Sequence, residues 1–321
     1  MNAPERKTVS IRTLLAVNAL VLGGLFGVVF CGFEVYYRYY YDSTDLLGLT
    51  RISERWFERH YQNNKLEIRD NIEYTSTVDP GRKRVTFLGD SFTAGHGVAD
   101  VDRRFVNLLR KRTAGRLELH AAARNGFDTA QEIGALRFLA GMGYETDVVV
   151  LVYVLNDVSD LIPAWQANLA RVYRERADEP FLVRHSYFIN KLYYQLKATR
   201  DPGVANYFTL IRDAYDGPIW EQQQARLTGL AEYCRFRNLK LLVVTFPFLQ
   251  ALGPDYAYAG IHRRLDRLWS ELGVPHLDLL PVFASYAPEQ VVVGKYDAHP
   301  NERAHAVAAD AIGEFIDKQM N

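Results

Sequence analysis

Short apolar runs alternate with helical patterns from residue 84 to the C-terminus, and this alternation restricts the fold more than any other feature. Apolar strands that are separated by helices are typical of a mostly parallel sheet covered by helices on both faces. We therefore expect an α/β fold. The expected strands are residues 85–88, 117–120, 148–154, 239–246 and 275–279, and the expected helices are residues 102–112, 130–140, 220–237 and 260–272.

The first expected strand ends in residues suited to a ligand site. Its apolar run stops at Gly89, and Asp90 and Ser91 follow before a helical pattern begins. This layout places Ser91 at the carboxyl end of the strand, the edge at which ligands bind in open α/β sheets. A Gly-Asp-Ser turn also suits the start of a helix for conformational reasons alone. A catalytic interpretation therefore depends on partners later in the chain.

Three later segments supply such partners. Gly126 follows the second strand, and Asn156 follows the end of the third strand. Near the C-terminus, Pro300 favours an extended backbone before it, so Asp297 and His299 should lie on one face of an extended segment. The carboxylate would then hold Nδ1–H of the imidazole and leave Nε2 free to face the serine.

These four segments, in this order, resemble the motifs of the SGNH hydrolases, also called the GDSL esterase and lipase superfamily. The resemblance covers the chain from the first strand onward and implies a three-layer α/β/α sandwich with a flavodoxin-like sheet. It implies Ser91 as the nucleophile, His299 as the general base and then acid, and Asp297 as the orienting carboxylate. The N–H groups of Ser91 and Gly126 and the side chain of Asn156 would hold the oxyanion.

The sequence departs from the family pattern at two points. Val154 stands where the family usually has glycine, which we expect to narrow the site, and the acid and base are two residues apart where three is common. Thr93 occupies the last position of a Gly-x-Ser-x-Gly elbow, which argues against an α/β-hydrolase. Possible pocket neighbours are Asp90, His96 and Asp157.

The Asp-x-His pair also occurs in metal sites. We expect no metal here, because the next histidine, His305, falls on the following helix and turns away. No cofactor is implied by the family resemblance.

Residues 13–33 form an apolar run of 21 residues that is interrupted only by Thr13 and Asn18. As a helix the run would reach about 31 Å, enough to cross the hydrocarbon core of a bilayer. The flanking charges are Arg6, Lys7 and Arg12 before the run and Glu34 and Arg38 after it. The positive-inside bias predicts a cytoplasmic N-terminus and a periplasmic or extracellular remainder.

A cleaved signal peptide is the alternative for this run, although the run is long and lacks a small-x-small exit. A lipoprotein signal at Cys31 is disfavoured because Phe30 before it is bulky. The tyrosines at positions 36, 37 and 39–41 would suit the lipid headgroups, or an aromatic helix packed on the globular domain.

The expected organisation is a cytoplasmic N-terminus (residues 1–12), a transmembrane anchor (13–33), a juxtamembrane stalk and lead-in (34–82) and a hydrolase domain (83–321). Residues 160–218 interrupt the alternation with helical patterns at 164–174 and 187–199. An insertion after the third strand would emerge near the site, so it is either a lid or substrate-binding wall, or a packed helical decoration.

Lysine plus arginine and aspartate plus glutamate both total 38, which argues against a nucleic-acid partner. The expected locations of Cys31, in the apolar run, and Cys234, in a predicted helix, argue against a disulfide. The expected function is a membrane-anchored serine esterase that removes an O-acyl group, such as acetyl, from an extracytoplasmic ester or glycan. The alternatives are an O-acyltransferase acting on cell-envelope polysaccharide and a non-catalytic glycan-binding scaffold.

Overall fold

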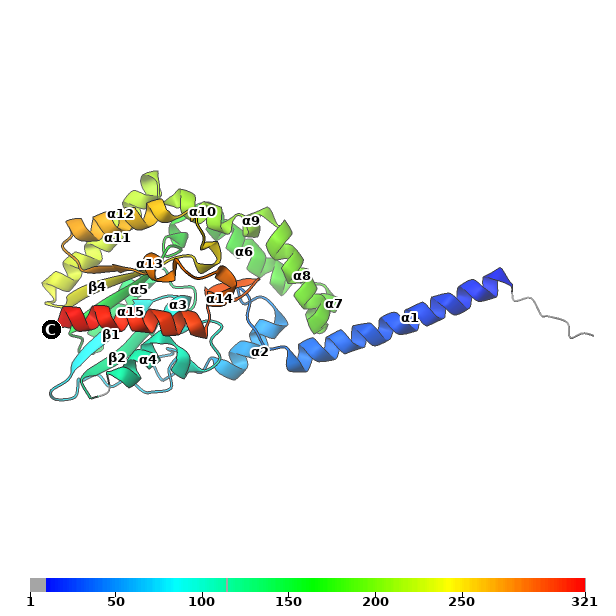
Figure 1. Cartoon of the computed structure of the whole chain (residues 1–321), viewed down its shortest axis with the longest axis horizontal. Helices are drawn as coiled ribbons and strands as arrows, with labels where there is room; N and C mark the ends of the chain where they lie inside the picture. Colours follow the sequence, from blue (N-terminus) through cyan, green and yellow to red (C-terminus); the bar gives the residue numbers. More distant parts are fainter. Residues whose placement is uncertain (1–9, 114, 321) are drawn as a thin grey trace, which may run out of the picture.

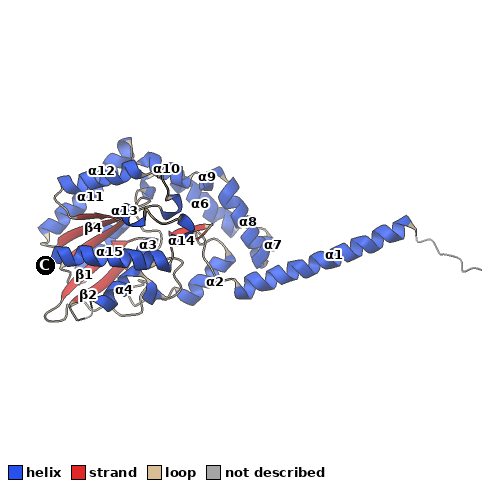
Figure 2. Ribbon diagram, in the orientation of Figure 1, coloured by secondary structure: helices blue, strands red, loops and turns tan. Residues whose placement is uncertain are grey.

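A parallel sheet of five strands forms the centre of the protein in a computed structural model, which describes residues 10–113 and 115–320. The strand order is β2-β1-β3-β4-β5, and every neighbouring pair is parallel (Figure 2). The strands are β1 (Lys83–Gly89), β2 (Leu117–Ala123), β3 (Val148–Val154), β4 (Lys240–Phe246) and β5 (His276–Asp278). The predicted α/β fold with a mostly parallel sheet is confirmed.

Helices cover both faces of this sheet. Helices α4 and α15 pack on each other over one face, and α5 and α11 pack on each other over the opposite face (Figure 1). The helices of the sandwich are α3 (Ser91–Ala94), α4 (Phe105–Arg112), α5 (Thr129–Gly141), α11 (Gly217–Phe236), α12 (Ala259–Glu271), α13 (Leu280–Phe283), α14 (Pro288–Val291) and α15 (Glu302–Met320).

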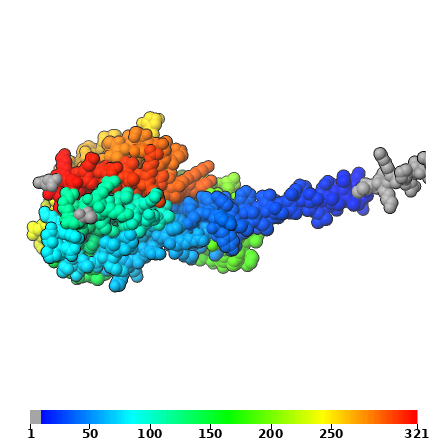
Figure 3. All heavy atoms as spheres, turned by 60° about the horizontal axis from the view of Figure 1, so that its bottom comes forward, coloured from blue at the N-terminus to red at the C-terminus, as the bar shows by residue number. Residues whose placement is uncertain are grey.

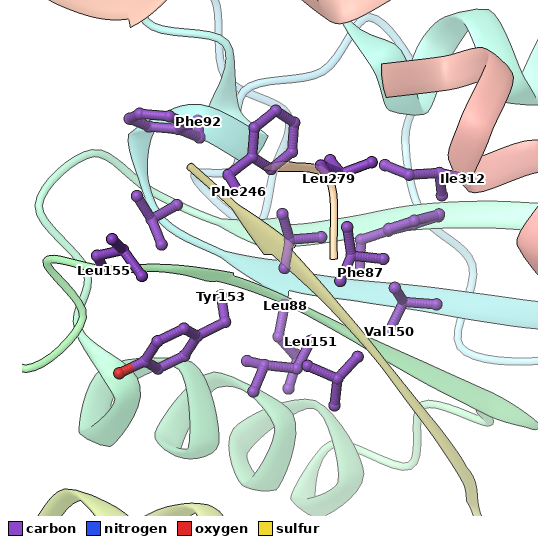
Figure 4. Packing of buried hydrophobic residues seen from close by; sticks show 14 of the residues in the cluster. Phe87, Leu88, Phe92, Val150, Leu151, Tyr153, Leu155, Phe246, Leu279 and Ile312 are labelled. Atoms are coloured by element: carbon purple, nitrogen blue, oxygen red, sulfur yellow. The ribbon is translucent and has the colours of Figure 1, made fainter. Parts of the chain in front are cut away.

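The core lies between these helices and the strands. All seven residues of β3 are buried, because a central strand with helices on both faces has no solvent side. Figure 4 shows side chains from β1, β3 and β4 packing on both faces, with Ile312 of α15 closing one of them. This packing fixes the positions of the carboxyl ends of the strands.

An antiparallel hairpin lies beside the carboxyl ends of the strands. It consists of β6 (Val292–Gly294) and β7 (Asp297–Pro300). The extended backbone that Pro300 predicted for Asp297 and His299 is present as β7, whereas the pairing with β6 was not predicted.

All regular secondary structure in residues 160–218 is helical. The predicted helices at 164–174 and 187–199 are confirmed as α6 and α8. The insertion contains α6 (Pro163–Ala177), α7 (Phe181–His185), α8 (Tyr187–Arg200), α9 (Pro202–Ala205) and α10 (Tyr207–Ala214), and α11 begins at its end.

The first helix, α1 (Ile11–Val35), projects from the globular body, and all its residues are at least partly exposed (Figures 1 and 3). A π-helical turn at Tyr36–Tyr40 extends it. Among the described residues, this one helical stretch is long and apolar enough to be a membrane span or a signal sequence.

The segment interpreted above as a stalk and lead-in packs onto the globular body. It contains α2 (Arg51–His60), whose Ile52 and Trp56 are each 2% exposed. Arg69 is fully buried and donates hydrogen bonds to the carbonyl oxygens of Ala94 and Val98, in the loop that follows Ser91. Residues 42–82 therefore form one wall of the domain, because their apolar and charged side chains find partners there.

Candidate active site

The turn between β1 and α3 presents Ser91 at the carboxyl edge of the sheet. A Cβ at Gly89 would lie 2.2 Å from Thr93 Oγ1, so the turn leaves no room for a side chain there. The Asp90 carboxylate caps the short helix by accepting a hydrogen bond from the Phe92 amide at 2.8 Å. These two constraints fix Ser91 as the first residue of α3.

Ser91, His299 and Asp297 form a continuous hydrogen-bonded row. His299 Nε2 lies 2.9 Å from Ser91 Oγ, and His299 Nδ1 lies 2.5 Å from Asp297 Oδ1. Because a carboxylate only accepts, Nδ1 carries the hydrogen and Nε2 is free to accept the serine proton. Residues two apart on an extended strand point to the same side, so β7 delivers the acid and the base together.

Burial and charge set the protonation of this row. Burial raises the pKa of Asp297, but the positive charges of His299 and His96 and their hydrogen bonds outweigh it, so the pKa falls well below its usual range. Burial lowers the pKa of His299 and the charge of His96 lowers it further, against the opposing effect of Asp297. An ionised Asp297 beside a neutral His299 is the state that general-base catalysis requires.

His96 stacks on the imidazole of His299, with ring centroids 3.9 Å apart and an interplanar angle of 15°. Asn125 Nδ2 lies 3.0 Å from His96 Nδ1, and because an amide nitrogen only donates, the neutral form of His96 carries its hydrogen on Nε2. This Nε2 lies 3.1 Å from the carbonyl oxygen of Asp45 and 3.4 Å from Asp297 Oδ2. His96 therefore supports the acid of the row at Oδ2, whereas His299 contacts Oδ1 of the same carboxylate.

The sequence identified His96 only as a pocket neighbour, and it gave no indication of Thr44. The hydroxyl of Thr44 donates to Asp297 Oδ2. The sequence likewise gave no indication that Asp45 and Asn125 contact His96. Asn125 is next to Gly126 in a quoted motif, whereas Thr44 and Asp45 lie in a segment with no motif and reach the site only through tertiary packing.

The three predicted oxyanion donors face one cavity of about 520 Å³, whose wall includes Ser91, Gly126 and Asn156. Gly126 has φ +78° and no heavy atom within 4 Å of the position of a Cβ. A substrate could therefore approach its amide closely. Asn156 Nδ2 lies 3.4 Å from Asp90 Oδ2, which orients the amide group at the cavity edge.

A family model described as the GDSL-like lipase/acylhydrolase family matches residues 87–307, about two thirds of the chain. The chain belongs to this family. It is an ester-bond hydrolase with the fold that the sequence predicted.

Solved structures similar to this GDSL-like hydrolase include the psychrotrophic esterase EstA from Pseudoalteromonas sp., at 16% identity and a TM-score of 0.45, covering 74% of this chain and 99% of that one. The extracellular lipase from Streptomyces rimosus is 13% identical, with a TM-score of 0.48 and the same coverage, 74% and 99%. The acetylxylan esterase Axe2 from Geobacillus stearothermophilus is 13% identical, with a TM-score of 0.45, covering 73% and 94%. A search of curated proteins gave no match.

The helical insertion forms one side of the cavity of the GDSL-like hydrolase. Trp165, Leu169 and Tyr173 of α6 and Tyr207 of α10 line it. An adjoining apolar pocket of about 260 Å³ lies between α8 and residues 45–50 and shares Leu46, Leu47, Phe208, Gln250 and Ala298 with the main cavity. Of the two alternatives for the insertion, the structure therefore favours a substrate-binding wall.

Three of the expected site features lie outside the cavity wall. Asp90, Asp157 and Val154 are buried, with Asp157 Oδ2 accepting from the Val154 amide at 2.8 Å. The valine at the usual glycine position therefore faces the core and does not narrow the cavity. Burial raises the pKa of Asp90 to about 6 and, with repulsion from Glu132, raises the pKa of Asp157 well above its usual range.

One group among the described side chains has the spacing of a metal site, because ligand atoms of His96, Asp297 and His299 all lie within 4.8 Å of one another. These are two side chains of the hydrogen-bonded row and the His96 that supports it. Their hydrogen bonds to one another and to Ser91 use both ring nitrogens of His299, so a metal bound there would have to displace the serine contact.

Proposed function

We propose that this GDSL-like hydrolase is a membrane-anchored serine esterase that removes an O-acyl group, such as acetyl, from an ester or acylated glycan outside the cytoplasmic membrane. The observation that supports it most directly is the 2.9 Å contact between Ser91 Oγ and His299 Nε2. It joins two groups that are 208 positions apart in the chain.

In the proposed reaction, Ser91 Oγ attacks the ester carbonyl carbon while His299 Nε2 takes its proton. The negative charge that moves to the carbonyl oxygen is stabilised by the amides of Ser91 and Gly126 and the side chain of Asn156. His299 then gives the proton to the leaving alcohol as the ester bond breaks. Water attacks the acyl-serine in the same way and releases the carboxylic acid and free Ser91.

The composition of the cavity wall supports a polar alcohol part in the substrate. Amide and carboxylate side chains stand among aromatic rings, which gives hydrogen-bonding groups and flat apolar faces for a ring-shaped polar molecule such as a sugar. The residues concerned are Asn125, Gln131, Asp160, Gln166, Trp165 and Tyr173.

The contacts of α1 support an anchor that stays attached. Phe33 stacks on Phe188 of α8 with centroids 4.9 Å apart, and the Glu34 carboxylate accepts a hydrogen bond from Ser186 Oγ at 2.7 Å. The end of α1 is thus packed on the catalytic domain, whereas the exit of a signal sequence must be accessible for cleavage. With the basic residues before α1, this supports a cytoplasmic N-terminus and an external catalytic domain.

The test is hydrolysis of a p-nitrophenyl ester panel of increasing acyl length by the full-length protein in detergent. We expect the acetyl ester to give the largest kcat/KM, and Ser91→Ala to lower kcat by about 10⁴-fold or more. A serine-reactive phosphonate should label Ser91. A fully active Ser91→Ala variant, or no phosphonate labelling, would contradict the proposal and favour a non-catalytic scaffold.

Product analysis with an acyl donor, with and without an acceptor glycan, then separates hydrolysis from transfer. Free carboxylic acid as the main product in both reactions is the expected result. Acyl groups appearing on the glycan would identify an acyltransferase that uses the same acyl-serine.

A further inference from the structure

The helical insertion carries an exposed apolar surface that ester hydrolysis does not use. Phe181 and Leu182 of α7 are 74% and 63% exposed. Their neighbour Val183 is 6% exposed and belongs to a small core cluster with Leu49 and Tyr194. Val183 therefore holds α7 on the domain while its two larger neighbours point outward.

Hydrogen bonds fasten α7 and the start of α8 to the end of α1. The Glu34 carboxylate accepts from Ser186 Oγ at 2.7 Å and from the Phe188 amide at 3.1 Å. Arg38 Nη2 donates to the carbonyl oxygen of His185 at 2.9 Å. The insertion cannot move along α1 without breaking these contacts.

Aromatic contacts set the level of α7 along α1. The Phe188 ring stacks on Phe33 at 4.9 Å and meets Phe30 edge-on at 5.8 Å. Phe30 lies three residues inside the apolar run, about 4.5 Å along the helix from its end. The start of α8 is therefore level with the outer part of the proposed membrane span. Figure 1 shows α7 beside α1, at the end of the globular body from which α1 projects.

The exposed residues around this surface are those typical of a membrane interface. Arg184 and His185 of α7 are exposed, and Tyr39 and Tyr40 in the π-helical turn after α1 are 63% and 74% exposed. Tyrosine is enriched at the headgroup level, and basic side chains there attract anionic lipid headgroups.

We propose that α7 is a second membrane-contact site, which inserts Phe181 and Leu182 at the boundary between headgroups and acyl chains of the bilayer that α1 crosses. The inference rests on the proposed anchor. A single helix would leave the catalytic domain free to tilt with that helix relative to the bilayer. A second contact through the insertion restricts this tilt, and because α6 of the same insertion lines the cavity, the cavity keeps one inclination to the lipid surface.

Fluorescence quenching in lipid nanodiscs tests this site with the full-length protein. An environment-sensitive fluorophore is attached at one thiol, and phospholipid with a nitroxide near the top of its acyl chain is the quencher. The native Cys31 in α1 is exposed and reports on the anchor, whereas Cys234 is 1% exposed and protected from labelling. Two further variants are made in a Cys31→Ala background. Phe181→Cys reports on α7. Phe236→Cys is the matched control, because Phe236 at the end of α11 is also an exposed phenylalanine (84% exposed).

The expected result is that nitroxide lipid lowers the fluorescence at Cys31 and at Phe181→Cys about two-fold or more and leaves Phe236→Cys nearly unchanged. Quenching at Cys31 without quenching at Phe181→Cys would overturn the α7 site and leave the anchor intact. Quenching at neither position would overturn both, and equal quenching at all three would indicate non-specific adsorption and overturn the α7 site. Unchanged p-nitrophenyl acetate hydrolysis by each labelled variant verifies that it is folded.

Discussion

His299 is buried between two groups with opposite effects on its charge. Burial and the stacked His96 lower its pKa, and the Asp297 carboxylate raises it. The net lowering favours the neutral imidazole, which is the form that accepts the proton of Ser91. His96 is therefore a positioning residue that acts through Asp297 and His299.

The pH dependence of catalysis should reveal this arrangement. We expect kcat/KM to rise with pH through a midpoint below about 6.5, the ordinary pKa of histidine, because protonated His299 cannot act as a base. His96→Gln removes one cause of the lowered pKa, so the midpoint should move upward. The measurement is the pH profile of p-nitrophenyl acetate hydrolysis, and an unchanged or lower midpoint in His96→Gln would contradict the role given to His96.

Asn156 offers a second test at the scale of one side chain. Asn156→Ala removes a donor that interacts mainly with the charge of the transition state, so kcat should fall by about 10²–10³-fold with little change in KM. Gln166→Ala, on α6 in the same cavity wall, is the matched control and should retain kcat. A raised KM with an unchanged kcat in Asn156→Ala would contradict the role of Asn156 as an oxyanion donor.

At the scale of elements, a buried ion network joins the segment before β1 to α4. Asp70 Oδ2 lies 2.9 Å from Arg104 Nη2, 2.7 Å from Arg110 Nη2 and 2.5 Å from the Tyr74 hydroxyl. Burial raises the pKa of Asp70, but its hydrogen bonds and the two arginine charges outweigh burial and lower it. This network anchors the wall that also carries Arg69, which holds the loop after Ser91.

Asp70→Asn should lower the free energy of unfolding by about 3–5 kcal/mol, because it leaves the buried guanidinium of Arg104 and the partly buried guanidinium of Arg110 without their countercharge. Since the pKa of Asp70 is lowered on folding, its contribution is present above about pH 4 and is lost as the pH falls further. Urea unfolding in detergent at pH 7 and pH 3 measures both effects. Asp79→Asn, in an exposed pair with Arg82, should change stability by less than about 1 kcal/mol. Equal effects of the two substitutions would contradict the importance of the buried network.

At the scale of the whole molecule, α1 and the catalytic domain form one connected structure. An N-terminal epitope tag should therefore remain on the mature protein, and the tagged protein should stay in membranes after an alkaline carbonate wash. When protease is added outside intact cells, we expect it to digest the catalytic domain and to leave the N-terminal tag intact. A soluble exported form that has lost the tag would show that the apolar helix is a cleaved signal.

The order of strands and helices was predictable because each depends on a local pattern. The apolar run at residues 148–154 is β3, and the breaks at Gly89 and Asn156 mark the carboxyl ends of their strands. The motif spacing likewise identified Ser91, Asp297 and His299, which the structure brings within hydrogen-bonding distance. A turn, a strand or an Asp-x-His pair depends on residues that are adjacent in the chain, so it can be predicted from the sequence alone.

Only the tertiary structure decided which residues surround and support Asp297 and His299. Thr44 and Asp45 precede β1 by about forty residues, and they reach Asp297 because the segment after α1 folds back over the site. The stacking of His96 on His299 and the attachment of α8 to Glu34 arise in the same way. Such contacts depend on burial and on which surfaces meet after the chain collapses, and no periodicity or spacing in the sequence records them.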